Sequence, residues 1–405
     1  MVNHEPPEES KALNPTVVKL GFVSFLADVA SEMLYPVTPI FLTTVLGASM
    51  ASLGLIEGVA EATASLLKTF AGRASDRMGR RKPFVVVGYL LAALSKPFIG
   101  AATSWIHVLL ARALDRTGKG LRSAPRDALI ADSVSAANCG AAFGWHRGMD
   151  TFGAAVGPLL AVYLISARPG DLRSLYYWAI IPGLLSVLVT LTLKETKQKE
   201  KKRLAESASK PAMSFLSWRE FGPDLKKYVI AWTTFSLTNS SDVFLLMKAK
   251  ASGLSIQHTI LLYCAYNLIY SLSSPYLGIL SDRIPRKNIL ISGLAVFAAV
   301  YVGFAFATDT WHFWLLFICY GLYMGATDGV GKALVVDLCE PKRKATALGF
   351  LGTTSGLATI FASTAAGLLW DHSGATTAFL FGAAGAVLAS VLLLKVTVPD
   401  VPAAR

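Results

Sequence analysis

The segment 105–131 carries a high density of charge inside an otherwise apolar stretch, so its side chains are the first candidates for chemistry. Its ionisable residues are Arg112, Asp115, Arg116, Lys119, Arg122, Arg126 and Asp127. Four of the cations, from Arg112 to Arg126, are spaced by four, three and seven residues, which places them near one face of a helix. A charged face is too costly to lie against lipid, so in a membrane protein it is expected to line a central cavity or a water-filled path.

Asp28 and Glu32 in the segment 17–46 offer the complementary charge, one helical turn apart. A carboxylate inside a bilayer is costly to keep ionised, so it can take up a proton near physiological pH, as a proton-coupled carrier requires. The same acids can instead neutralise the cations of 105–131 as buried pairs. Both interpretations stay open, because a pair that breaks on protonation is itself a coupling device.

The composition indicates that these residues belong to a membrane protein. Hydrophobic residues make up 53% of the 405 positions and charged residues only 16%, whereas soluble domains carry roughly 25% charged residues. Twelve membrane helices of about 20 residues take up roughly 240 positions, which leaves little room for a separate soluble catalytic domain. The sequence also contains no HExxH, GxSxG or phosphate-binding signature. We therefore expect an all-α polytopic membrane protein that is not an enzyme and has no cofactor.

Twelve apolar segments alternate with polar loops, and one long polar stretch divides them six and six. The segments are 17–46, 50–71, 83–102, 105–131, 144–166, 175–194, 226–247, 257–278, 288–308, 311–337, 346–369 and 374–396. The predicted organisation is a tail (1–16), a six-helix bundle (17–194), a linker (195–225), a second six-helix bundle (226–396) and a second tail (397–405).

The basic loops and the linker fall on one side of these segments. The positive-inside rule makes that side cytoplasmic, together with both termini, and predicts a multi-pass protein of the inner (plasma) membrane. The net charge of +12 has the same explanation, so we expect no nucleic-acid partner.

The two halves of the chain repeat each other. GRASDRMGRRK around Asp76 returns 206 residues later as GILSDRIPRK around Asp282. ALIAD, ending at Asp132, returns 205 residues later as ALVVD, ending at Asp337. These matches predict two bundles related by a pseudo-two-fold axis, with a substrate site between them near the middle of the membrane.

The loop signature in the first half resembles that of the major facilitator superfamily of secondary transporters, and the resemblance covers essentially the whole chain. The signature residues are Gly72, Asp76, Arg77, Gly79, Arg80 and Arg81, with a degenerate copy at Gly278, Asp282, Arg283, Arg286 and Lys287. The resemblance implies a gate in which Arg80 pairs with Asp132, and Arg286 with Asp337. The alternative is that these bases only anchor the loop on the cytoplasmic side.

Two further patterns resemble motifs of that family. Gly153, Gly157 and Pro158, preceded by Gly144, resemble a motif of proton-driven exporters, although Ala161 and Val162 replace its last glycines. Close packing of helices through small residues is the alternative explanation. The run Arg116 to Gly120 resembles a motif whose arginine is implicated in proton coupling, with Lys119 in place of a glutamine.

The family resemblance also implies that the first, fourth, seventh and tenth helices line the cavity. Polar residues of the last two are Asn239, Asp242, Asp328 and Lys332. Glu57 and Glu61 form either an outer gate or a wet face, and the tyrosines of 257–278 either contact a solute or pack in the core.

These expectations combine into one function. The chain is expected to be a proton-coupled secondary transporter, an exporter of a small polar or charged solute by alternating access, acting as a monomer in the lipid bilayer. The alternatives are export of a metal or metal chelate, or a receptor of the same fold without net transport. No His/Cys cluster in the sequence suggests a resident metal site.

Overall fold

The computed structural model describes residues 14–134, 139–193, 218, 221–281, 283–339 and 344–398, and the regular elements within these ranges are helices. The first bundle consists of α1 (Pro15–Glu32), α2 (Thr38–Ile40), the π-helix η1 (Phe41–Val45), α3 (Met50–Met78), α4 (Lys82–Gly100), α5 (Trp105–Ser133), α6 (Cys139–Ala167) and α7 (Leu172–Leu191). The second consists of α9 (Pro223–Ser236), α10 (Val243–Ala251), α11 (Ile256–Ser281), α12 (Arg286–Phe306), α13 (Thr310–Leu338), α14 (Lys344–Ser373) and α15 (Ala375–Leu394).

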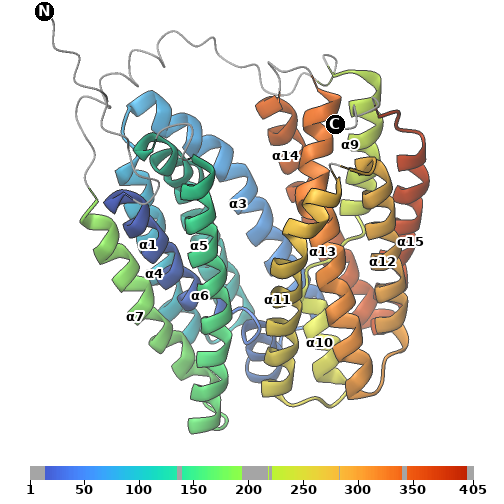
Figure 1. Ribbon diagram of the computed structural model, residues 1–405. Helices are drawn as coiled ribbons and strands as arrows, with labels where there is room; N and C mark the ends of the chain where they lie inside the picture. The colour runs from blue at the N-terminus through green and yellow to red at the C-terminus, as the bar shows by residue number, and fades with distance from the viewer. Residues whose placement is uncertain are drawn as a thin grey trace, which may run out of the picture.

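The two bundles stand side by side, and each crosses the same thickness six times (Figure 1). In the first bundle α1 and the α2–η1 segment form one crossing, and in the second bundle α9 and α10 do the same. This arrangement confirms the predicted fold of twelve helices in two bundles. The predicted linker and the two tails lie mostly outside the described residues.

The first crossing of each bundle is broken at an equivalent place. The break after Glu32 spans residues 33–37, and the break after Ser236 spans residues 237–242, about one repeat length later. Broken helices near the middle of the membrane expose backbone groups to a cavity, and transporters place binding sites there. The repeat seen in the sequence therefore extends to the break in the first crossing of each bundle.

In each bundle, one pair of neighbouring basic residues ties helices together at the same end, which we call the basic end. Arg81 pairs with Asp132 at 2.6 Å, and Arg286 pairs with Asp337 at 2.5 Å. Lys82 donates to the carbonyls of Leu191 and Leu193 at the end of α7. Lys287 donates to those of Leu394 and Val396 at the end of α15. Cations suit the carbonyl end of a helix, so both lysines cap the last helix of their bundle.

The bundles touch along α3 and α14 and diverge toward the basic end (Figure 1). A Cβ added at Gly367 would lie 2.2 Å from the Met50 carbonyl oxygen, and one at Gly356 would lie 2.8 Å from Ser65 Cβ. Nearer the basic end, a Cβ at Gly352 or Gly349 would meet nothing within 4 Å. The contact between the bundles is therefore tight at the opposite end and absent along this stretch of α14 near the basic end.

Asp371, near the end of α14, strengthens the contact between the bundles at the end opposite the basic end. Its two carboxylate oxygens accept the backbone N–H groups of Met50 and Ala51, at 3.0 and 2.8 Å. These N–H groups lie at the start of α3, where a helix favours negative charge. One side chain therefore links the two bundles at the end far from the basic residues.

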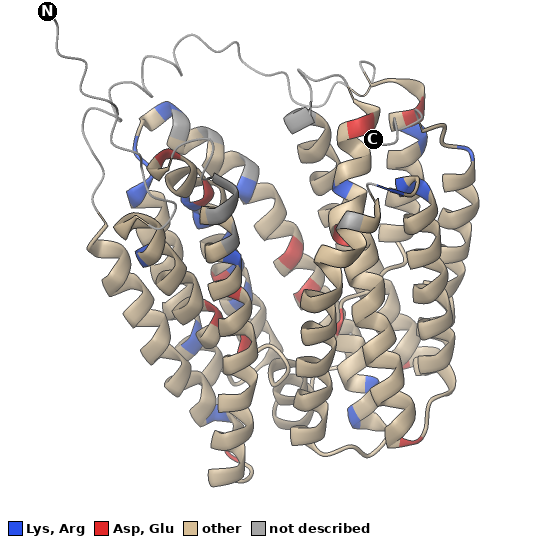
Figure 2. Cartoon of the chain, viewed as in Figure 1, with Lys and Arg blue, Asp and Glu red and all other residues tan. Residues whose placement is uncertain are grey.

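Seven helices of the described part of the chain contain a stretch long and apolar enough to cross a membrane: α3, α4, α6, α7, α12, α13 and α15. Helices α1 and α5 are outside this group, and both carry ionisable residues in their middle. Figure 2 shows charge inside the first bundle as well as at its ends. The outer surface of both bundles carries exposed apolar side chains such as Leu110, Tyr163 and Phe361.

Candidate functional site

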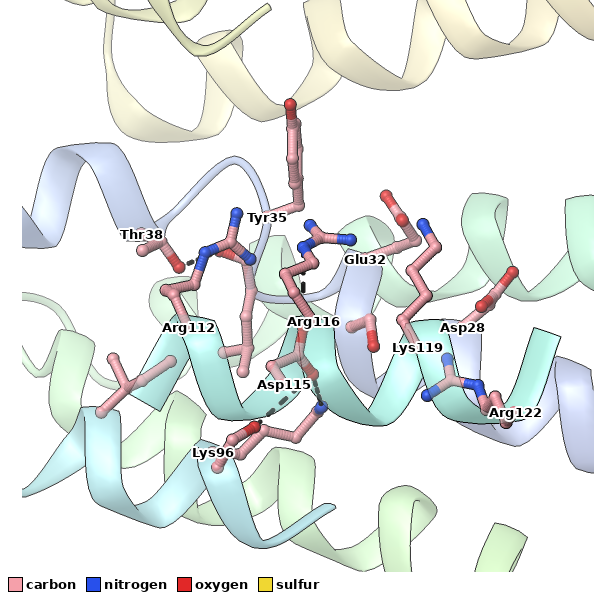
Figure 3. A pocket seen from close by; sticks show the side chains of 14 residues that line it. Asp28, Glu32, Tyr35, Thr38, Lys96, Arg112, Asp115, Arg116, Lys119 and Arg122 are labelled. Atoms are coloured by element: carbon pink, nitrogen blue, oxygen red, sulfur yellow. Dashed lines mark hydrogen bonds and ion pairs between the residues drawn. The ribbon is translucent and has the colours of Figure 1, made fainter. Parts of the chain in front are cut away.

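A cavity lies within the first bundle, against the broken crossing. Its volume is about 550 Å³ when the part open to solvent is included. Helices α1, α4 and α5 and the break before α2 supply its walls (Figure 3). The lining residues are Asp28, Ser31, Glu32, Leu34, Tyr35, Thr38, Ser95, Lys96, Ile99, Arg112, Asp115, Arg116, Lys119 and Arg122.

Helix α5 presents its charged face to this cavity because it is wedged between α3 and α4. A Cβ added at Gly118 would lie 2.4 Å from the Gly88 carbonyl oxygen of α4. A Cβ added at Gly120 would lie 2.7 Å from Leu67 Cβ of α3. These glycines use the two flanks of α5 for close helix contacts, so the remaining face points inward. Of the stripe predicted from the sequence, Arg112, Arg116 and Lys119 therefore line the cavity and Arg126 does not, whereas Arg122 lines it from outside the stripe.

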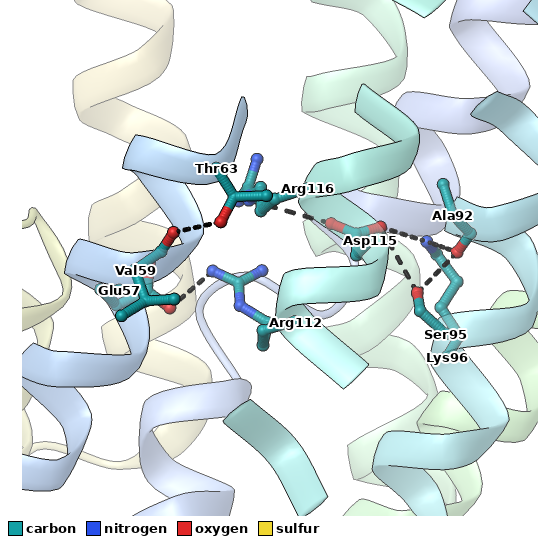
Figure 4. A network of polar contacts seen from close by, with 9 residues as sticks. All are labelled: Glu57, Val59, Thr63, Ala92, Ser95, Lys96, Arg112, Asp115 and Arg116. Carbon is teal, nitrogen blue, oxygen red and sulfur yellow. Dashed lines mark hydrogen bonds and ion pairs between the residues drawn. The ribbon is translucent and has the colours of Figure 1, made fainter. Parts of the chain in front are cut away.

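The cations of α5 are only partly neutralised by neighbouring helices (Figure 4). Arg112 pairs with Glu57 of α3 at 2.5 Å, and both side chains are buried. Asp115 lies 3.4 Å from Lys96 of α4 and 3.8 Å from Arg116. Sequence reasoning missed Lys96, although a lone cation inside the apolar segment 83–102 was the signal that could have found it.

Asp28 of α1 lies at the edge of the cavity, next to Asp150 of α6. The Nη1 atom of Arg147 lies 3.3 Å from Oδ2 of Asp150. Asp150 was not singled out from the sequence, because its partner is more than a hundred residues away. Its position just before Gly153 in the glycine motif was the available signal.

The glycines of α6 press directly on the part of α1 that carries the acids. A Cβ at Gly153 would lie 2.5 Å from the Phe25 carbonyl oxygen and 3.0 Å from Asp28 Cβ. A Cβ at Gly157 would lie 2.8 Å from the Met33 nitrogen, where α1 ends. Pro158 follows, buried within α6. The motif therefore fixes the distance between α6 and the break in α1.

The second bundle contacts the first through tyrosines of α11. The hydroxyl of Tyr263 donates to Glu32, and its ring lies 5.2 Å from that of Tyr35. Asp242 accepts from the hydroxyls of Tyr266 and Tyr320, at 2.8 and 2.6 Å. The acids on the two sides of the interface are thus held by phenol groups.

The other predicted residues of the second bundle do not reach the cavity of the first. Asp328 accepts from the Tyr270 hydroxyl at 3.0 Å and pairs with the exposed Lys332 at 2.7 Å. Asn239 lies in the break between α9 and α10, and its side-chain oxygen is buried without a hydrogen-bond partner among the described residues. None of these three, nor Asp242, is among the residues that line the cavity.

The expected gate pairs differ from the structure in one position. Arg81, rather than Arg80, forms the ion pair with Asp132; Arg81 lies 205 residues before Arg286, the same offset that separates Asp132 from Asp337. Each pair joins two helices of the same bundle, so it holds the bundle together instead of joining the two bundles. Arg77 and Arg80 are exposed at the basic end. Gly72 lies against α5, where its Cβ would be 3.1 Å from Ala124 Cβ. The side chain of Asp76 and the whole of Asp282 lie outside the described residues.

Comparison with known proteins agrees with this architecture. The family model described as the Major Facilitator Superfamily matches residues 20–255 and, in an overlapping match, 228–405. An uncharacterized MFS-type transporter of Methanocaldococcus jannaschii is 34% identical over 394 residues, which cover 96% of each chain. Among solved structures, the nucleoside transporter NupG gives a TM-score of 0.76 at 16% identity, over 95% of this chain and 99% of that one. A D-xylose-proton symporter gives 0.74 at 18% identity, over 96% and 98%.

The structural likenesses concern the fold, while the family match spans nearly the whole sequence. The fold, the repeat and the enclosed charges agree with that match. The chain is thus a multi-pass membrane transporter, and it belongs to the major facilitator superfamily.

Proposed function

We propose that this transporter is a proton-coupled antiporter that exports a small polar or charged solute. The observation that carries this proposal is the position of two neighbouring carboxyl groups, Asp28 and Asp150, at the edge of a charged cavity, where they can share a proton. A shared proton at this position is available both to the cavity and to solvent, because the Asp150 side chain is 19% exposed. Losing that proton would set two negative charges against each other and force α1 and α6 to rearrange.

Charged groups surround the pair. Asp150 lies near Arg126 of α5 and near His146 and Arg147 of its own helix. Asp28 faces Glu32 of α1, which opposes a second negative charge, and Lys119 of α5, which attracts one. Arrival of a solute that changes the position of Lys119 would therefore change the proton affinity of Asp28. This is the linkage that antiport needs.

Export is supported by the packing of the glycine motif on α1. Gly153 and Gly157 contact the backbone on either side of the acids, so a change at Asp28 is transmitted directly to α6. The positive-inside rule favours a cytoplasmic position for the basic end, with both termini, in the inner membrane. The bundles diverge at that end, which suits uptake of a solute from the cytoplasm (Figure 1). We take the working unit to be the monomer, since the cavity is built from one bundle.

The alternative of metal export has little support in the geometry. Among the described residues, no group of three or more His, Cys, Asp or Glu side chains could hold a metal ion together. A receptor without transport has no specific observation in its favour either.

Everted membrane vesicles test the proposal, because their cytoplasmic face is outward and respiration acidifies their interior. A solute exported in exchange for protons restores the fluorescence of a quenched pH-gradient dye when it is added outside. We expect at least one compound in a panel of amino acids, organic acids, phosphate esters and amines to do so with the wild type and not with Asp28→Asn. Arg168→Gln, which removes an exposed cation at the opposite end, is the matched control. If no compound restores fluorescence, or if Asp28→Asn behaves as the wild type, antiport is refuted.

A further inference from the structure

The cavity contains more positive than negative charge. Its lining residues include five cations and three acids. Adding Glu57, which neutralises Arg112 from behind, leaves a net charge of +1, and a proton on Asp28 raises this to +2. A cavity with this balance, enclosed by helices of low dielectric constant, favours an anion over a cation.

Arg122 is a buried cation with little local compensation. Its residue is 6% exposed, and its Nη1 atom is buried without a hydrogen-bond partner among the described residues. Its guanidinium lies 4.4 Å from the centre of the Tyr89 ring, which holds the group in place without neutralising it. No ion pair within the described part of the chain joins Arg122 to an acid. A buried guanidinium with an unused donor is expensive unless something else binds it.

Two more cations of α5, Lys119 and Arg116, line the same cavity and lie three and six residues before Arg122. Arg116 keeps only a long contact of 3.8 Å with Asp115, and Figure 3 shows its guanidinium directed into the cavity beside Tyr35. Lys119 extends towards Glu32 (Figure 3). One nearby acid is already occupied, since Glu32 accepts a hydrogen bond from the Tyr263 hydroxyl.

We infer that the transported solute is an organic anion whose carboxylate or phosphate group binds to Arg116, Lys119 and Arg122. This inference rests on the proposed transport function and names its substrate class. Planar guanidinium groups bind such oxyanions through two parallel hydrogen bonds, so two arginines that line one cavity form a suitable cradle.

The charge selectivity of the cavity can be measured without knowing the solute. In a variant lacking all four native cysteines, Ser31→Cys places one thiol on the cavity wall. Its reaction rates with an anionic and a cationic methanethiosulfonate reagent of similar size are compared with those of a control thiol at the exposed Thr103. We expect the anionic-to-cationic rate ratio to be at least about tenfold higher at position 31 than at position 103. Arg122→Gln should lower the ratio severalfold, whereas Arg122→Lys and Arg168→Gln should largely preserve it.

A binding measurement on purified wild type then tests the chemical class. The probes share one skeleton and differ in charge: succinate, succinamide and 1,4-diaminobutane, with glycerol 3-phosphate and glycerol as a second set. Thermal stabilisation by an anionic member, absent in its neutral and cationic counterparts and lost in Arg122→Gln, supports the inference, and the set that responds separates carboxylate from phosphate.

An equal or lower thiol-reactivity ratio at position 31, or preferential binding of a neutral or cationic probe, overturns the inference. The reactivity ratio depends on neither a proton gradient nor the direction of transport. An anion-selective cavity in a protein that fails the vesicle assay would therefore refute antiport alone.

Discussion

The buried ion pair between Glu57 and Arg112 gives the sharpest prediction about stability. The side chains are 6% and 8% exposed, and the nitrogen–oxygen distance is 2.5 Å. Removing one member of such a buried pair leaves the other charge uncompensated, which costs about 3–5 kcal/mol. The same pair in water would contribute at most about 1 kcal/mol. Glu57→Ala should therefore destabilise the protein by several kcal/mol if α3 and α5 enclose the pair as described.

The double variant separates charge from packing. Glu57→Gln/Arg112→Gln removes both charges. Its loss in free energy of unfolding should therefore be smaller than the summed losses of Glu57→Gln and Arg112→Gln, by at least about 2 kcal/mol. Unfolding in mixed micelles of mild detergent and dodecyl sulfate, followed by the fluorescence of the eight tryptophans, supplies the free energies. A cost under about 1 kcal/mol for each single change, or strict additivity, would show that Arg112 is solvated and would refute the enclosed arrangement.

Three more predictions test separate parts of the account. Gly153→Ala should cost about 1–3 kcal/mol because its Cβ would lie 2.5 Å from a backbone oxygen of α1, whereas Gly148→Ala on the same helix, with nothing within 4 Å, should cost far less; thermal unfolding compares them. Arg81→Gln and Arg286→Gln should lower stability by similar amounts, about 1–3 kcal/mol each, while the exposed Arg77→Gln changes it little; unequal costs would contradict their equivalence. Tyr263→Phe keeps the ring beside Tyr35 but loses the hydrogen bond to Glu32. It should therefore raise the reactivity of the Ser31→Cys thiol toward reagents added at the end opposite the basic end. Unchanged reactivity would show that this hydrogen bond does not help to close that end.

Local patterns in the sequence were sufficient to predict the architecture. The length of each apolar segment and the recurrence of motifs about 205 residues apart depend on no tertiary contact, and both led to two six-helix bundles. The charged face of α5 was also accessible, because the spacing of Arg112, Arg116 and Lys119 alone assigns these residues to one side of a helix.

Features that depend on packing between distant segments were not accessible in the same way. Asp150 acquires its significance only when Gly153 brings α6 onto α1 beside Asp28. The pairing of Asp132 with Arg81 depends on the turn at Gly79, whose φ of 65° sets the start of α4 and so decides which basic residue faces α5. A shift of one residue in a loop is invisible to motif spacing.

The polar residues of the second bundle illustrate a different limit. Asp242 and Asp328 were expected to line a cavity, yet tyrosine hydroxyls from α11 and α13 bind their carboxylates. The tyrosines of 257–278 can be recognised in the sequence, but their bonds to these acids follow from the way the helices pack, which the sequence alone does not reveal.

The central claim is that a proton on the Asp28–Asp150 pair controls which end of the transporter is open. Spin labels at the exposed positions Met78 and Ile284, one in each bundle at the basic end, measure this opening by electron–electron resonance in lipid nanodiscs. Because we propose that the pair carries a proton when the basic end is open, as it is in the structure, we expect that lowering the pH increases the population with the long distance. In Asp28→Asn this population should no longer respond to pH. A distance distribution that is independent of pH in the wild type, or equally dependent on pH in Asp28→Asn, would contradict the claim.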